Sequence, residues 1–286
     1  NCLKENIVKV WNGKWFDRGF VGKGDEVIGG KQYLFLDTQP LGILSDVISG
    51  KEKRRLLENI ENLCVKDEPF GASSLSPVMK GRFLKPGMDT NGGIWHAINA
   101  WLTWAWAKIN PNSAWKFFLK SMLFTHADSY PDVWYGIWSG PDAYNSRLST
   151  NPGETFNLNF TPMTDFPIMN MNCHSGILFS LIKLLSIEPS ANGISVIPLI
   201  PLRKYNFNSQ LIDIEKTEEN FMFIYKPVCN CSVKLSIRSP FPISLEEQVQ
   251  LQIGEKILKK FEYSEDTIKI ETKLSTLSPL KLLIKK

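Results

Sequence analysis

The hydrophobic pattern changes its period near residue 194, and this change limits the possible folds more than any other feature. After it, short β-branched stretches alternate apolar and polar residues, as in CSVKLSIRS and TIKIETK. Turn residues such as Asn192-Gly193 and Gly254-Glu255 separate these stretches. Several alternating segments in a row are typical of an antiparallel sheet or sandwich. We therefore expect residues 191–286 to form a C-terminal antiparallel, β-sandwich-like domain.

Before this change the pattern is mostly helical. Apolar residues recur at helical spacing in 51–65, 111–128 and 166–187, the last with Thr164 or Asp165 as N-cap and Pro189 as stop. Long loops separate these helices, and such loops in a compact domain are usually functional. The side chains expected to be buried are Leu56, Leu57, Ile60 and Leu63 of the first helix and Trp115, Phe118, Leu119 and Met122 of the second.

Charge and cysteine content exclude several classes of protein. The net charge of +4 is a small difference between 33 basic and 29 acidic residues, without a dense basic patch, so a nucleic-acid partner is not expected. No apolar run approaches the ~18–20 residues of a membrane span. The five cysteines show no zinc-type spacing. We expect reduced thiols in a cytoplasmic protein, with no metal and no organic cofactor.

A helix expected over 91–107 carries a polar stripe on an otherwise apolar cylinder. Gly92 and Gly93 at its first turn are poor helix formers, which indicates a close approach of backbone or ligand. His96, Asn99 and Thr103 follow at i, i+3 and i+7, on one face. The stripe either faces a polar cavity or satisfies the backbone of neighbouring loops.

The segment YPDVWYGIWSGPDAYNS at 130–146 gathers rings and carboxylates between glycines. Rings stack on the apolar face of a sugar, and carboxylates bond to its hydroxyl groups. The alternative is a loop whose rings only cap the core. Glu154 and Asp165 are further carboxylates nearby, and inverting glycosidases need two carboxyl groups roughly 6.5–9.5 Å apart. Of the histidines, His126 is expected to complement a helix C-terminus and His174 to be a core residue.

Four motifs in order resemble the second half of glycoside hydrolase family 94, the cellobiose and chitobiose phosphorylases. They are DRGFVGKGDEVIGGKQYLFLDTQPLGIL at 17–44, TNGGIWHAINAW, TPMTDFP and LLSIEPSANGISVIPLIP. The resemblance implies an α+β fold, in which residues 1–190 are the C-terminal part of an (α/α)6 barrel, six-hairpin glycosidase-like, with long sugar-binding loops. The C-terminal β domain would follow it.

The chain departs from the family where phosphate would bind. The family's phosphate histidine falls at Ala97, one residue after His96, and its Thr-Gly loop becomes Thr164-Asp165. A carboxylate ~4 Å from a phosphate opposes binding by about 1–4 kcal/mol. The family's general acid, an Asp in a DWND-like stretch, has no counterpart here. The resemblance therefore implies that a missing N-terminal portion of the same enzyme, or a partner subunit, supplies the acid.

These features together predict part of an inverting glycoside hydrolase that acts on oligosaccharides with water as acceptor and with Asp165 or Glu154 as general base. A glycoside phosphorylase and a non-catalytic carbohydrate-binding module are the alternatives. The expected partners are an oligosaccharide and the rest of the enzyme, with a possible homo-oligomer and without membrane or nucleic acid. The expected sugar-binding residues are Gln39, Asn91, His96, Asn99, Tyr130, Trp134, Tyr135, Trp138, Asp142 and Thr164.

Overall fold

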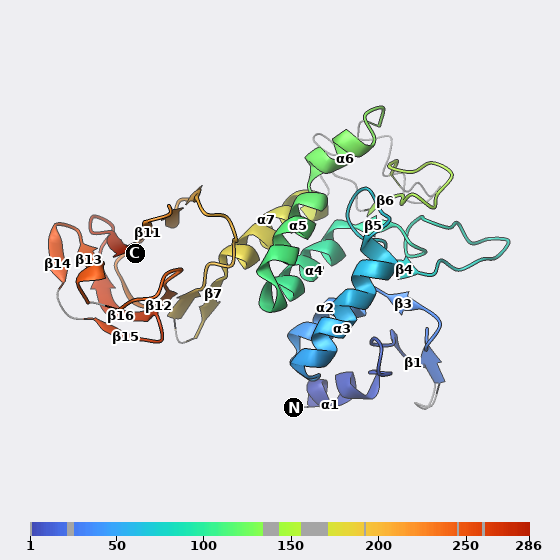
Figure 1. The fold of residues 1–286 in the computed structure, drawn as a ribbon, viewed down its shortest axis with the longest axis horizontal. Helices are drawn as coiled ribbons and strands as arrows, with labels where there is room; N and C mark the ends of the chain where they lie inside the picture. Colours follow the sequence, from blue (N-terminus) through green and yellow to red (C-terminus); the bar gives the residue numbers. More distant parts are fainter. Residues whose placement is uncertain are drawn as a thin grey trace. The chain divides into compact units, whose positions relative to one another are not determined.

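The structure, a computed structural model, describes residues 2–21, 26–133, 143–155, 171–191, 193–244, 246–258 and 261–286. The chain divides into two compact units, Asn1–Leu184 and Leu185–Lys286, and its fold is α+β (Figure 1). In the described ranges, every helix is too short or too polar to cross a membrane. The (α/α)6 arrangement of the helical unit remains a prediction.

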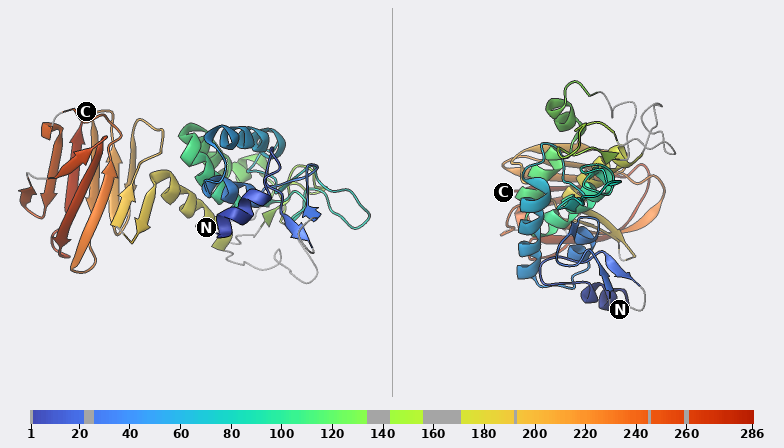
Figure 2. Two further views of the ribbon diagram at one scale, coloured as in Figure 1. Left: turned by 90° about the horizontal axis from the view of Figure 1, so that it is seen from below. Right: turned by 90° about the vertical axis from the view of Figure 1, so that its right-hand side faces the viewer.

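The first unit, which we call the helical unit, combines helices with very short strands (Figures 1 and 2). Its helices are α1 (Cys2–Lys9), α2 (Thr38–Leu44), α3 (Gly50–Ile60), the π-helix η1 (Glu61–Val65), α4 (His96–Ile109), α5 (Pro111–Lys120), α6 (Leu123–Ser129) and α7 (Met171–Leu185). Its strands are β1 (Gly19–Val21), β2 (Glu26–Ile28), β3 (Leu34–Phe35), β4 (Leu75–Ser76), β5 (Ile94–Trp95) and β6 (Ala143–Tyr144).

The helix expected over 51–65 forms, but its last turn is a π-helix. A capping box between Ser49 and Glu52 starts α3, and Leu56, Leu57 and Ile60 are buried as expected. In η1 the Lys66 N–H donates to Glu61 O at 2.8 Å, five residues back. The wider turn changes which side chains face the core. Cys64 and Val65 are therefore buried, and the expectation for Leu63 was wrong, since it is 45% exposed.

The segment 111–128 forms two helices rather than the one expected. At the break the Ser121 hydroxyl donates to Phe117 O at 2.9 Å, and the Thr125 hydroxyl donates to Leu119 O at 2.7 Å. Phe117 O still accepts its ladder bond from Ser121 N at 3.0 Å, whereas Leu119 O accepts the Thr125 hydroxyl and, at 3.2 Å, Met122 N, three residues on, so the regular ladder stops at Leu119. Phe118 is buried as expected, whereas Leu119 is exposed and Trp115 and Met122 are only half-buried, so the expectation for these three was wrong or met only in part.

Segments far apart in the sequence pair edge to edge beside the starts of α2 and α4. Leu36 N donates to Ser74 O and Ser74 N to Gly93 O, both at 2.9 Å, while β3 pairs with β4 and β5 with β6. Tyr144 also pairs with Thr155. We call these segments, residues 34–36, 73–76, 93–95, 143–144 and 155, the strand ladder. It is the frame on which the candidate site is built.

Gly92 and Gly93 lie before α4, in the turn that enters β5. Gly92 has φ 98°, and a Cβ there would lie 2.6 Å from a methyl group of Val78. A Cβ at Gly93 would lie 2.6 Å from Asp89 O, to which Gly93 N donates at 2.8 Å. The close approach that requires glycine here is thus an approach of the protein to itself.

The second unit, which we call the β unit, contains two sheets (Figure 2, left, yellow to red). The orders are β14-β13-β17-β11-β10-β9 and β15-β16-β12-β8-β7. Among the described residues the strand pairs of the β unit are antiparallel except β8–β12, which is parallel and corrects the fully antiparallel expectation. The strands are β7 (Ile187–Ser190), β8 (Gly193–Val196), β9 (Tyr205–Asn208), β10 (Ile212–Lys216), β11 (Asn220–Tyr225), β12 (Cys231–Arg238), β13 (Val249–Ile253), β14 (Lys256–Leu258), β15 (Glu262–Ser264), β16 (Thr267–Leu274) and β17 (Leu280–Lys285), with a 3-10 turn at Glu246–Gln248.

Alternating burial shows that each sheet of the β unit covers a core with one face. Val233, Leu235 and Ile237 are buried along β12, as are Leu280, Leu282 and Ile284 along β17. This period of two is that of strands with one buried face, and the sandwich-like packing of the two sheets remains a prediction. The β unit begins at Leu185 because β7 pairs with β8, so Pro189, expected to stop a helix, lies in an edge strand.

Candidate functional site

Only part of the predicted sugar site falls on described residues. Gln39, Asn91, His96, Asn99, Tyr130 and Glu154 are described, and they lie on or next to the strand ladder and the first turns of α2 and α4. Trp134, Tyr135, Trp138, Asp142, Thr164 and Asp165 lie outside the described residues, as does the side chain of His174.

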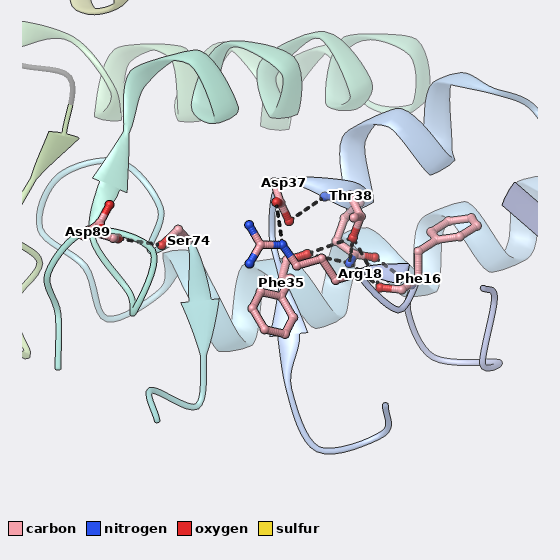
Figure 3. Close-up of polar contacts among 8 residues, drawn as sticks. Phe16, Arg18, Phe35, Asp37, Thr38, Ser74 and Asp89 are labelled. Carbon is pink, nitrogen blue, oxygen red and sulfur yellow. Dashed lines mark hydrogen bonds and ion pairs between the residues drawn. The ribbon is translucent and has the colours of Figure 1, made fainter. Parts of the chain in front are cut away.

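Gln39 ties the start of α2 to two other segments. Its Oε1 accepts from Phe16 N at 2.8 Å, while Nε2 donates to Phe16 O at 2.8 Å and to Phe35 O at 2.6 Å. The Thr38 hydroxyl donates to the same two carbonyls (Figure 3). Gln39 is fully buried, so its amide serves the backbone in this structure.

Asn91 closes the base of the loop 79–91. Met79 N donates to Asn91 Oδ1 at 2.7 Å, and Asn91 Nδ2 donates back to Met79 O at 3.1 Å. The side chain thus imitates a pair of strand hydrogen bonds. Asn91 holds the loop directly before β5, where we had expected contact with a sugar.

The polar stripe of α4 bonds to the protein backbone. Asn99 Oδ1 accepts from Ala72 N at 2.8 Å, and Nδ2 donates to Trp95 O at 2.8 Å and to Ala72 O at 3.3 Å. The Thr103 hydroxyl donates to Asn99 O at 3.0 Å. For these two residues the structure matches the second interpretation, in which the stripe satisfies neighbouring backbone.

His96 belongs to a buried cluster of rings. Its ring centroid lies 5.6 Å from those of Phe70 and Tyr144, in edge-on contacts, and the residue is almost fully buried. The next residue, Ala97, is half-buried in the first turn of α4. The more accessible of these two adjacent positions therefore carries only a methyl group.

His126 is a further member of the ring cluster. Its ring lies 4.2 Å from that of Tyr144 and 5.3 Å from that of Phe70. Nε2 lies 2.8 Å from Gly153 O, a carbonyl, so Nε2 carries the proton and donates. Burial lowers the pKa of His126, partly offset by this hydrogen bond, which favours the neutral ring. His126 thus fastens the loop 145–155, a role that the sequence did not reveal.

Glu68 fastens the same loop from the end of η1. Its Oε2 accepts from Arg147 N at 3.1 Å, and its Oε1 lies 3.7 Å from Arg147 Nε. Arg147 also reaches Asp67 at 3.4 Å. Burial raises the pKa of Glu68, and the hydrogen bond and charge of Arg147 offset this only in part. Glu68 could not be recognised from the sequence, because its burial follows only from the position of the loop.

The structure brings two predicted site residues, Tyr130 and Glu154, close together. Gly153, at φ 79°, lies so close to the Tyr130 ring that a side chain there would clash with it. Glu154 O accepts from Asn145 N at 2.7 Å, which fixes the backbone, and its side chain is half-buried. Within the described part of the chain, the Glu154 carboxylate and the Tyr130 hydroxyl make no hydrogen bond. The Tyr130 hydroxyl is buried, so of the two groups only the half-buried Glu154 carboxylate can be reached by a ligand.

Metal ligands do not gather in this region. Among the described residues, no three His, Cys, Asp or Glu side chains come together as a metal ion would require.

Comparison with known proteins gives a family match for the first part of the chain. Residues 1–130 match the model of the glycosyl hydrolase 94 superfamily, catalytic domain. The family resemblance predicted from the sequence motifs is thereby confirmed for this part of the chain, which ends where the ring-rich segment begins. A search of curated proteins gives no match.

The chain is also similar to parts of some solved structures. An α-L-rhamnosidase from Dictyoglumus thermophilum has 11% identity and a TM-score of 0.48, over 97% of this chain and 27% of that one. A GH127 β-L-arabinofuranosidase from Geobacillus stearothermophilus T6 has 10% identity and a TM-score of 0.28, over 88% and 40%. The chain thus spans about a quarter of the rhamnosidase and two-fifths of the arabinofuranosidase.

Proposed function

We propose that the chain is part of an enzyme that hydrolyses oligosaccharides with inversion and uses water as the acceptor. The family match over residues 1–130 supports a carbohydrate-active enzyme. The rest of the enzyme, or a partner subunit, supplies the general acid. Cytoplasmic location and assembly with another subunit are part of this proposal.

The first turn of α4 is the observation that favours water rather than phosphate as the acceptor. The family resemblance puts a phosphate-binding histidine at position 97, where this chain has a half-buried alanine. A methyl group offers phosphate neither a hydrogen-bond donor nor a positive charge. The adjacent His96 is packed among Phe70 and Tyr144. A site without the histidine that would bind the phosphate anion favours a neutral acceptor such as water.

Glu154 supplies a suitable base among the described residues. Its carboxylate is half-buried, and its backbone is held by Asn145, next to the ring of Tyr130. As general base it would take a proton from water while the acid protonates the leaving oxygen, with the two carboxyl groups roughly 6.5–9.5 Å apart. Asp165, in the position of the family's phosphate loop, is the second candidate base.

The test is an assay of the whole protein on glycosides of defined linkage, with and without inorganic phosphate. We expect hydrolysis that does not depend on phosphate and that falls about 100-fold or more in Glu154→Gln or Asp165→Asn. Glu255→Gln, which removes an exposed carboxylate from the β unit, is the matched control. Release of a sugar 1-phosphate would instead identify a phosphorylase, and binding without turnover would identify a carbohydrate-binding module.

A further inference from the structure

We propose that Arg18 and Asp37 form an additional subsite, which binds adjacent hydroxyl groups of a neutral sugar. The inference rests on the proposed function and names a class of ligand for it. Arg18 precedes β1, and Asp37 is the N-cap residue of α2. Both lie in the segment 17–44 that resembles the family, but neither was among the expected site residues.

Two contacts fix the guanidinium group of Arg18. Its Nε lies 3.2 Å from Asp37 Oδ2, and its central carbon lies 4.9 Å from the centroid of the Phe35 ring (Figure 3). Phe35 itself is buried, so the platform under the guanidinium is rigid. A planar group held by an ion pair and a ring loses little freedom when a ligand binds.

The bonding edge of this pair remains accessible. Figure 3 shows the two terminal nitrogens of Arg18 turned away from Asp37. Among the described residues Asp37 is the only ion-pair or hydrogen-bond partner of Arg18, and the two side chains are 39% and 33% exposed. Asp37 Oδ1 accepts from Thr38 N at 3.0 Å, which orients the carboxylate. The pair therefore offers unused donors next to carboxylate lone pairs.

The charge of the pair selects the ligand. A guanidinium without a counterion would attract a phosphate or a sugar acid, but Asp37 cancels its charge at 3.2 Å and would repel an anion. A hydroxyl group can accept a hydrogen bond from Arg18 and donate one to Asp37 at the same time. Two adjacent hydroxyl groups fit the fork of donors and acceptors, so the chemical class is a neutral sugar.

The strand ladder joins this pair to the rest of the candidate site. Leu36, directly before Asp37, donates to Ser74 O, and Ser74 N donates to Gly93 O, both at 2.9 Å. The ladder then continues through β5 and β6 to Thr155, beside Glu154. The subsite and the proposed base are thus fixed to one frame.

The experiment is calorimetric titration of the whole protein with neutral glucose tetrasaccharides of different linkage, and with tetragalacturonate as the acidic probe. Arg18→Lys keeps the charge and loses the fork, and it should raise the Kd for the best neutral ligand about tenfold or more. Asp37→Asn keeps the cap on Thr38 and removes the negative charge. It should weaken the neutral ligand similarly and increase affinity for tetragalacturonate, a change of preference that a merely structural role would not cause.

Arg238→Lys, on an exposed position of β12, is the control and should bind like the wild type. If the wild type binds a neutral tetrasaccharide and both site variants bind it equally well, the subsite is wrong and the proposed function stands. If Asp37→Asn gains no affinity for tetragalacturonate, the charge argument is wrong. If the wild type binds none of the neutral sugars, the proposed function itself fails, and the subsite with it.

Discussion

At the scale of single residues, Glu68 is a carboxylate that the protein both buries and pairs. It is 5% exposed, and burial raises its pKa above the ordinary 4.5. The folded state therefore holds the proton more tightly than the unfolded state. The stability that Glu68 contributes is complete below about pH 4.5 and is lost as the pH rises through the raised pKa.

We therefore expect the Glu68→Gln variant to gain stability relative to wild type as the pH rises from about 4 to 7. Urea unfolding at a series of pH values measures this difference in the free energy of unfolding. Glu255→Gln controls for the removal of one charge. A difference that is constant, or that moves in favour of wild type with rising pH, would show that pairing with Arg147 outweighs burial.

Residue types indicate a polar site, but they do not distinguish a side chain that binds sugar from one that holds the backbone. Gln39, Asn91 and Asn99 have the amide groups that sugars need, and in the structure all three bond to backbone. What decides between the roles is whether a backbone segment distant in sequence approaches the amide. Glu154, by contrast, keeps a half-buried carboxylate, and the buried Tyr130 hydroxyl has no hydrogen-bond partner among the described residues.

At the scale of elements, Asn99 links α4 to the segment before β4. The Asn99→Ala substitution removes three hydrogen bonds and leaves Ala72 N and O buried without these partners. We expect it to cost about 2–4 kcal/mol of the free energy of unfolding, measured by urea denaturation. Asn62→Ala, at an exposed position of η1, should change it by less than about 0.5 kcal/mol. An equally small effect of Asn99→Ala would mean that water replaces the amide.

Helical periodicity predicts the existence of α3, α4 and α5 well and their ends poorly. The bond from Lys66 to Glu61 that widens the last turn of η1 leaves no mark in the hydrophobic pattern. The break after Ser121 is marked by Leu119 O, which accepts from the Thr125 hydroxyl and from Met122 N instead of following the helical ladder. Boundaries therefore follow from a competition between local hydrogen bonds, which a count of apolar positions does not include.

At the scale of the whole molecule, we propose that the two units are separate cooperative structures. Leu282→Ala in β17 and Leu102→Ala in α4 each truncate a fully buried side chain, at a cost of about 2–5 kcal/mol. We expect each variant to raise amide hydrogen exchange, read by mass spectrometry, only in its own unit. Equal loss of protection in both units after either substitution would show that the chain unfolds as one body.

The change of hydrophobic period near residue 194 indicates the β region correctly, but not how its strands pair. The parallel contact between β8 and β12 joins Ile194 to Leu235, which are far apart in the sequence. Alternation shows which face of a strand is buried, and it contains no information on its neighbour. For the same reason the sequence did not show that β7 and Pro189 belong to the sheet.

The strand ladder has a consequence for the order of folding. Its rungs join residues 34–36, 73–76, 93–95, 143–144 and 155. All of them except the last, between Tyr144 and Thr155, close a long stretch of chain, whereas α3, α4 and α5 need only local contacts. Closing such stretches costs entropy that only the completed neighbours repay. During synthesis, the helices can form as they emerge from the ribosome, but the last rung waits for residue 155. We therefore expect the helices to form before the strand ladder that frames the candidate site.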